Sequence, residues 1–440
     1  MKTKMMAKIL CLSFLSTVAL AAEGPAIERV GSTNKVGLDF IREAIKVDAK
    51  ESGTFHNTMI SPISAYTALA MLHGGLRQQT KTNLDTFLAV PATASAEFDS
   101  QNLALLNALR IQKLPDSEQP RHGPKSPVLG ISNSAWSTNG ATSRQPFAFT
   151  PDFTNSLQKN YAAETAALDF LNPKAADVVN SWANTNTNGM IPKVISSRVL
   201  SMLDWLLMNA TYLEASWAMK FTALKALEAP VFSLLNGEQI AVDMINGRGD
   251  INYVAGANYQ GVELPFFGAD LSFFALIPNT TQDFTAWMNG DSFFTQDNWN
   301  SILASFSQAS TERRDFVVHL KMPKFSFAYS KMMRKNDPLT LSLGLDFLFR
   351  PENKSDFAPL GGIIGAAPGT VVGLIKQDTM IVLDENGVKA AAVTVIGGGH
   401  TAVRPPRSVK EVVADKPFAF AIASKGTGAI LFIGTVVDPR

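Results

Sequence analysis

The sequence is poor in cysteine, in net charge and in long apolar runs. Its only cysteine in 440 residues is Cys11, so the chain beyond the N-terminus cannot form disulfides, cysteine metal sites or cysteine nucleophiles. Charged residues make up 18% of the chain and the formal net charge is +1, which excludes the strong basic field that attracts nucleic acid or acidic membranes. We therefore expect no nucleic-acid or membrane partner.

Motifs for enzyme chemistry are also missing. The sequence has no G-x-S-x-G and no H-E-x-x-H, and no two of its histidines are spaced as metal ligands: His56, His73, His122, His319 and His400. Asp384 and Glu385 are neighbours in an expected strand, where their side chains would face opposite ways and could not form an acid/base pair. The sequence thus predicts a protein that is not an enzyme and needs no metal or cofactor.

The N-terminus carries a targeting pattern. Lysines at positions 2, 4 and 8 precede the apolar run 9–20, and Ala19-Leu20-Ala21 offers a small-residue cleavage site. This pattern predicts a secretory signal peptide over residues 1–21, and the apolar run is shorter than the roughly 20 residues that span a bilayer. We expect a secreted or periplasmic protein whose remaining chain, rich in apolar residues, forms a core by packing alone.

Helical patterns come early in the sequence and strand patterns come late. Apolar spacing and breakers predict helices over residues 34–49, 63–72, 80–88, 98–111, 151–161 and 175–184, with one more over 338–348. Strands are expected over 129–136, 261–264, 271–277, 316–322, 380–383, 418–423 and 429–436. This order, without regular β-α alternation, favours an α+β domain.

Several segments, in order, resemble the serpin family of serine protease inhibitors. They are residues 57–64 (N-T-M-I-S-P-I-S), 180–191, 209–213 (N-A-T-Y-L) with Trp217, 263–278, 322–325 (M-P-K-F), 415–418 (D-K-P-F) and 430–439. The resemblance runs from about Val36 to Pro439. It implies one serpin domain over 22–440, with three β-sheets, about nine helices and an exposed reactive loop at about 385–408.

The resemblance also implies a function. Such a protein inhibits a serine endopeptidase as a suicide substrate: the target protease forms an acyl-enzyme with the loop, and the cleaved loop inserts into the main sheet before hydrolysis is complete. The implied partner is a target serine protease in a covalent acyl complex, and the implied state is a monomer. The alternative is a non-inhibitory serpin that acts as a binding or chaperone-like protein.

The segment that starts at Glu385 resembles the hinge of inhibitory serpins, and its residues support that interpretation independently. Strand alternation puts small or apolar side chains on one face and Lys389 on the other, while Gly387 can supply unusual backbone torsions. An ordinary permanent strand is the alternative, but Gly397 to Gly399 and Pro405-Pro406 would disrupt it. The hinge residues are Glu385, Gly387, Val388, Ala390, Ala391, Ala392 and Thr394.

The resemblance assigns further residues to the shutter and breach, the regions that open for the loop. They are Ser61, Ser64, Asn209, Trp217 and Gln377, with Trp217 beneath the point where the loop enters. The family usually has a histidine at the position of Gln377, bonded near Asn209 and Ser61. Glutamine can donate and accept hydrogen bonds, so it offers a substitute network.

The scissile bond has two candidates. Counting from the hinge gives Thr401-Ala402, which points to elastase-like or subtilisin-like proteases. Counting back from Pro417 gives a later position, between about Val403 and Arg407. Arg407-Ser408 then suits a trypsin-like enzyme, whose pocket carboxylate binds a cation. We favour Thr401-Ala402.

Overall fold

The structure is a computed structural model that describes residues 25–91, 97–111, 124, 127–140, 145–311, 315–388 and 407–440. The predicted signal peptide lies outside these residues. So do the hinge residues Ala390, Ala391, Ala392 and Thr394 and the candidate scissile bond Thr401-Ala402. Both ends of the predicted reactive loop are described.

The main sheet consists of two well-paired halves. Its order is β14 (Phe325–Met333), β16 (Ile375–Asp384), β17 (Gly387–Val388), β5 (Trp205–Ser216), β2 (Val128–Thr138) and β4 (Glu164–Leu168). β14 pairs with β16 along the whole of β14, and β2 pairs with β5 from Val128 to Ser137. The two-residue strand β17 joins the halves.

Two further large sheets complete the β-structure. One runs β1 (Thr58–Ile60), β20 (Ile430–Val436), β19 (Phe418–Ser424), β12 (Leu271–Pro278), β11 (Tyr259–Pro265) and β10 (Asn252–Ala255). Every residue of β12, β19 and β20 is buried, which explains their continuous apolar runs. The other runs β18 (Ser408–Val413), β13 (Phe316–Pro323), β9 (Met244–Gly249) and β6 (Thr222–Leu224). Two small pairs join β15 (Gly361–Ile363) to β3 (Phe147–Phe149) and β7 (Phe232–Ser233) to β8 (Gln239–Ile240).

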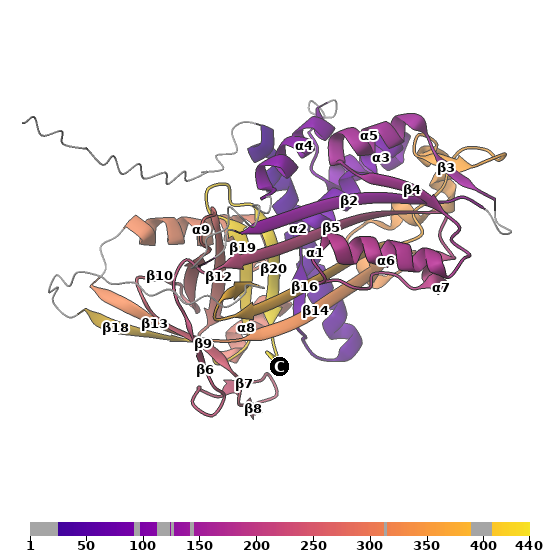
Figure 1. The fold of residues 1–440 in the computed structure, drawn as a ribbon. Coiled ribbons are helices and arrows are strands. Elements are labelled where there is room, and N and C mark those ends of the chain that lie inside the picture. The colour runs from indigo at the N-terminus through magenta and orange to yellow at the C-terminus, as the bar shows by residue number, and fades with distance from the viewer. Residues whose placement is uncertain are drawn as a thin grey trace, which may run out of the picture.

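Helices cover both faces of the main sheet (Figure 1). They are α1 (Pro25–Ser52), α2 (Pro62–Ala70), α3 (Gln78–Phe87), α4 (Phe98–Leu109), α5 (Pro151–Tyr161), α6 (Lys174–Asn186), α7 (Ser197–Leu200), α8 (Thr281–Asn289), α9 (Gln296–Thr311) and α10 (Pro338–Ser342), with 3-10 turns at His73–Gly75, Asp346–Phe349 and Pro351–Phe357. α6 packs on one face through a separate apolar cluster that includes Val179 and Leu206. Within the described ranges, no helix is long and apolar enough to cross a membrane, and no three His, Cys, Asp or Glu side chains gather as metal ligands.

The sequence-based elements mostly agree with this fold, but strands β4, β9, β10 and β14 were not predicted. α8 and α9 were not predicted, although Thr280 and Asp283 form a capping box at the start of α8. The helix expected over 338–348 ends at Ser342, because Gly344 adopts a φ of 68° and the chain continues as a 3-10 turn. Glu385 does not continue β16 but lies in a turn.

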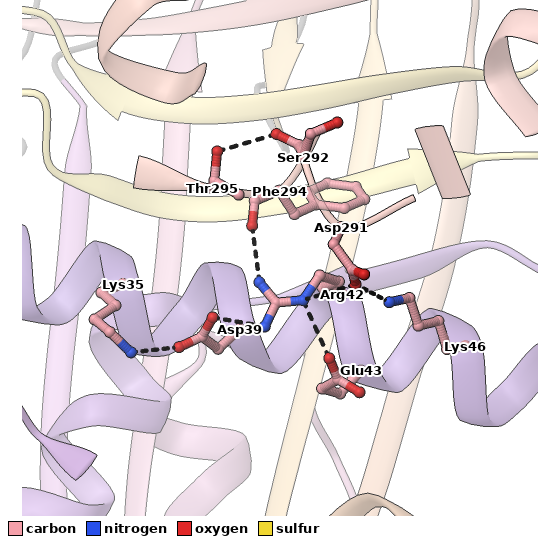
Figure 2. A network of polar contacts seen from close by, with 9 residues as sticks. All are labelled: Lys35, Asp39, Arg42, Glu43, Lys46, Asp291, Ser292, Phe294 and Thr295. Carbon is pink, nitrogen blue, oxygen red and sulfur yellow. Dashed lines mark hydrogen bonds and ion pairs between the residues drawn. The ribbon is translucent and has the colours of Figure 1, made fainter. Parts of the chain in front are cut away.

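The longest helix, α1, is tied to the corner between α8 and α9 by a network around Arg42 (Figure 2). Its guanidinium donates from Nη1 to the carbonyl oxygen of Phe294 at 3.3 Å and lies 2.8 Å from Asp39 and 3.1 Å from Glu43. Asp291, from the same corner, pairs with Lys46 of α1. Burial alone would lower the pKa of Arg42, but its hydrogen bonds to these carboxylates raise it. This network fixes α1 to the corner between α8 and α9.

Candidate functional site

The main sheet has an opening between its two halves. Among the described residues, β5 and β16 do not pair directly; each pairs with β17, through Ala215 and Leu383 on either side of Val388. Beyond β17, two cavities of about 40 Å³ lie along these strands, one beside α6 and one beside α2. Both are lined by Leu207, Asn209, Leu374 and Lys376. The strands therefore border a slot, which is closed at one end by β17 and lies between α6 on one face and α2 on the other.

The predicted hinge begins with a tight turn at the closed end of the slot. Asp384 ends β16, and its Oδ1 accepts a hydrogen bond from the backbone N–H of Asn386 at 2.7 Å. Glu385 makes an ion pair with Lys324, with 2.6 Å between Nζ and Oε2. Burial raises the pKa of Glu385, but the hydrogen bond from Lys324, a backbone hydrogen bond and the charges of Lys324 and Lys225 together lower it below its ordinary value. The turn is thus held by a charged carboxylate at ordinary pH.

Gly387 and Val388 form β17, so the hinge begins as a strand of the main sheet. Gly387 has a φ of 145°, and a Cβ added to it would lie 2.0 Å from the carbonyl oxygen of Ala215, so only glycine fits here. Val388 is 3% exposed and belongs to the main core, on the inward face where strand alternation puts it. The first inward residue of the hinge is therefore already packed between β5 and β16.

Trp217 lies directly beneath the hinge. Its indole Nε1 donates to the carbonyl oxygen of Asp384 at 2.9 Å, and its backbone N–H donates to the carbonyl oxygen of Asn386 at 3.0 Å. The ring is 3% exposed and stacks on Phe266 at a centroid distance of 4.9 Å. Trp217 holds the hinge turn in place and has no free face for a ligand.

The predicted shutter residues meet at the slot, but as two separate groups. Gln377 donates from Nε2 to the carbonyl oxygen of Ser61 at 2.8 Å, and the Ser61 hydroxyl caps α2 by accepting from the N–H of Ser64 at 3.3 Å. Across the slot, Asn209 donates instead to Asn133 at 2.7 Å. Gln377 thus replaces the family's histidine toward Ser61, but the expected hydrogen bond between Gln377 and Asn209 is not among the contacts of the described residues.

Three residues of the site were missed by sequence reasoning. Asn133 of β2 links Asn209 to the backbone carbonyl of Tyr161, at 2.7 Å. Thr379 donates from Oγ1 to the carbonyl of Met59 at 2.9 Å. Lys324 lies in the M-P-K-F segment, so that motif could have pointed to it. Nothing local in the sequence points to Asn133 or Thr379.

The far end of the predicted reactive loop joins a different sheet. Ser408 begins β18, and its backbone N–H donates to the carbonyl of Asp315 at 3.2 Å. Arg407 makes an ion pair with Asp250, and that contact raises the pKa of the arginine. β18 then runs parallel to β13 as the edge strand of its sheet. Both residues of the alternative scissile bond are therefore engaged at the start of a strand.

Comparison with known proteins identifies the family. The family model described as "Serpin (serine protease inhibitor)" matches residues 32–439. The chain belongs to the serpin family. Among relatives, an uncharacterised serpin-like protein of Thermococcus kodakarensis is 27% identical over 421 residues, covering 95% of this chain and 87% of its own. A leukocyte elastase inhibitor of Xenopus tropicalis is 27% identical over 394 residues, covering 88% of this serpin and 95% of its own chain.

Solved serpin structures share the fold in several conformations. The thermophilic serpin tengpin in its native state matches with a TM-score of 0.68 at 24% identity, covering 93% of this chain and 94% of its own. Cleaved serpin 42Da matches with a TM-score of 0.70 at 22% identity, covering 94% of this chain and 100% of its own. At these identities the likeness shows the α+β serpin fold alone. At the level of the family, serpins inhibit proteases and do not catalyse a reaction of their own.

Proposed function

We propose that this serpin inhibits a serine endopeptidase as a suicide substrate, by inserting its cleaved reactive loop into the slot between β5 and β16. The observation that carries the proposal is β17: the hinge already occupies the closed end of the slot, with hydrogen-bonded partners on both sides. A strand that has started needs only to be extended, because each further residue meets two bordering strands.

The register of β17 supports the extension. Continued residue by residue along β16 and β5, it would set Ala390 between Ile381 and Leu213, both buried. It would set Thr394 between Gln377 and Asn209. The Oε1 of Gln377 is buried and has no hydrogen-bond partner among the described residues, and a threonine hydroxyl can donate to it. Thr394, the polar inward residue of the hinge, would thus lie next to the polar side chains of Gln377 and Asn209 in the slot.

The chemistry comes from the target protease. Its serine attacks the carbonyl carbon of the scissile residue, an ester bond forms to the protease, and the amine of the next residue leaves with a proton from the protease's own base. Insertion of the freed loop then carries the acylated protease along the sheet before water can attack the ester. This serpin contributes the reactive loop, its hinge and the slot that receives the cleaved loop.

The anchoring of β18 favours Thr401-Ala402 over Arg407-Ser408 as the scissile bond. Arg407 pairs with Asp250 and Ser408 is hydrogen-bonded to Asp315. A protease binds its substrate as an extended exposed segment, so cleavage at Arg407 would first require these contacts to break. We therefore propose an elastase-like or subtilisin-like target.

A gel assay with elastase-like, subtilisin-like and trypsin-like proteases tests the proposal. An inhibitor gives an SDS-stable complex, a released peptide whose mass identifies the scissile bond, and a cleaved form that melts far higher. Replacing inward Thr394→Arg should turn it into a plain substrate, because a long charged side chain cannot be buried in the slot.

The matched control is Lys389→Arg, which puts the same side chain on the opposite face at a position that already carries a charge, and which should keep the complex. Complete cleavage of the wild-type chain without any complex or gain in melting temperature would favour the non-inhibitory alternative. A fragment cut only after Arg407 would overturn the assignment of the scissile bond alone.

We also propose that the protein is exported as a monomer after cleavage of residues 1–21. N-terminal sequencing of the protein recovered outside the cytoplasm should begin at residue 22. Sedimentation of that material should give one species near the mass of a single chain. An unprocessed cytoplasmic product would contradict export.

A further inference from the structure

β18 follows the far end of the reactive loop, and polar contacts attach it to its sheet. It lies at the edge of its sheet, with β13 as its strand partner. Residues 408–411 are all exposed and Val412 is buried, so little apolar packing fixes the strand. Most of its attachment must come from hydrogen bonds and charges.

His319 of β13 bridges the two strands on either side of it. Its Nδ1 lies 2.9 Å from Oε1 of Glu411 on β18, and its Nε2 lies 2.8 Å from Oδ1 of Asn246 on β9. The amide nitrogen of Asn246 donates to Thr222 of β6 at 3.3 Å, which turns the amide oxygen toward the histidine. Both ring nitrogens therefore face oxygen acceptors.

A neutral imidazole has one N–H and cannot donate to both oxygens, whereas the doubly protonated ring can. We propose that His319 is a pH-sensitive clamp, which holds β18 tightly to its sheet when doubly protonated and loosely when neutral. The ring belongs to the residue type whose charge changes between pH 5 and 8.

Charged residues of both signs surround the His319 ring. Glu411, directly opposite His319 on β18, favours the charged ring. Arg248, directly opposite it on β9, opposes the charge. Lys321 of the same strand lies 3.9 Å from Glu411 and shares its negative charge. No charge of β6 contacts the ring among the described residues; Thr222 reaches it through Asn246.

The clamp matters because an uncleaved loop cannot fill the slot while β18 stays in place. By the register of β17, Gly398 would face Trp205 at the far end of β5, about 33 Å along the strand from Val388. The residues from there to Arg407 span at most about 31 Å, and β18 lies beyond the hinge end of the sheet (Figure 1). Release of β18 is therefore required for the uncleaved chain to insert its loop and become inactive. This consequence rests on the proposed function; the clamp does not.

Hydrogen–deuterium exchange of the full chain tests the clamp directly. After correction for intrinsic rates, amides of residues 408–413 should exchange about threefold more slowly at about pH 5.5 than at about pH 8, as expected for a partly exposed ion pair. His319→Gln should remove this difference, because glutamine does not titrate. The control His56→Gln, at an exposed histidine away from β18, should retain it. Equal protection of wild-type β18 at both pH values, or an unchanged pH response in His319→Gln, would overturn the proposal.

Slow loss of the inhibitory form on incubation supplies a second readout, followed by melting temperature without any protease. In the wild type, conversion to a more stable form should be about threefold slower at about pH 5.5 than at about pH 8, and His319→Gln should convert at similar rates at both. A pH-dependent β18 in a chain that traps no protease would sink the proposed function and leave the clamp standing. If the chain traps a protease but the exchange of β18 does not depend on pH, the proposed function stands and the clamp is wrong.

Discussion

The two ends of the proposed reactive loop are held in opposite ways. At the hinge, Val388 is 3% exposed, pairs on both sides and needs a glycine before it. At β18, the side chain of Glu411 is 55% exposed and the strand is fixed largely by charged groups at a sheet edge. Packing responds weakly to pH and salt, whereas exposed charges respond to both. One end is thus fixed by packing, and the other by exposed groups that pH and salt can affect.

The largest effect is expected at the hinge. Gly387→Ala would put a methyl group 2.0 Å from the carbonyl oxygen of Ala215 and impose a φ of 145° on a non-glycine residue. We expect the free energy of unfolding to fall by about 3 kcal/mol, measured by chemical denaturation.

Gly31→Ala is the matched control, because nothing lies within 4 Å of the added Cβ and the site is helical. It should be neutral or slightly stabilising. Equal stability of the Gly387→Ala variant and the wild type would contradict the hinge geometry.

A second effect, of opposite sign to the β18 clamp, comes from His73. This ring is 4% exposed and packs on Phe98 at 4.3 Å, with Nζ of Lys81 at 2.7 Å and Oδ1 of Asp85 at 2.8 Å from Nε2. Burial, then the charges of Lys81 and Arg29, lower the pKa of His73 to about 3. An unfolded histidine binds its proton near pH 6.5, so the stability from this site is complete above that pH and falls toward pH 3.

We expect the free energy of unfolding to drop by about 2 kcal/mol between about pH 7 and pH 5 through His73. The slope should be reduced in His73→Gln and unchanged in His56→Gln, as measured by denaturation across the pH range. Acid would then weaken the whole fold while tightening β18, which separates the local clamp from global stability. A wild-type stability that rises on acidification would contradict this account of His73.

The smallest effect is expected at the loop's far end. Arg407→Gln removes the ion pair with Asp250, whose side chain is 71% exposed. The free energy of unfolding should change only slightly, because the pair is solvated on both sides, and the difference should vanish in about 1 M salt. Loss of several kcal/mol would show that β18 is held as firmly as the hinge, and the contrast between the two ends would disappear.

Sequence reasoning succeeded where the signal is local. The helix after Ser61-Pro62, the buried strands near the C-terminus and the inward face of Val388 follow from periodicity and breakers. The slot itself could not be predicted, because whether β5 and β16 pair depends on contacts between segments far apart in the chain. Asn133 illustrates the limit, because its role arises only from lying opposite Asn209 on the neighbouring strand β5.

The residue at the centre of the slot has a further consequence. Where the family usually has a histidine, Gln377 makes the contact with Ser61 through an amide. An amide carries no charge at any physiological pH, so acidification cannot alter the grip between this strand and α2. The contact between the main sheet and α2 is thus made without an imidazole, whereas His319 of β13 contacts Glu411 of β18, the edge strand at the far end of the proposed reactive loop.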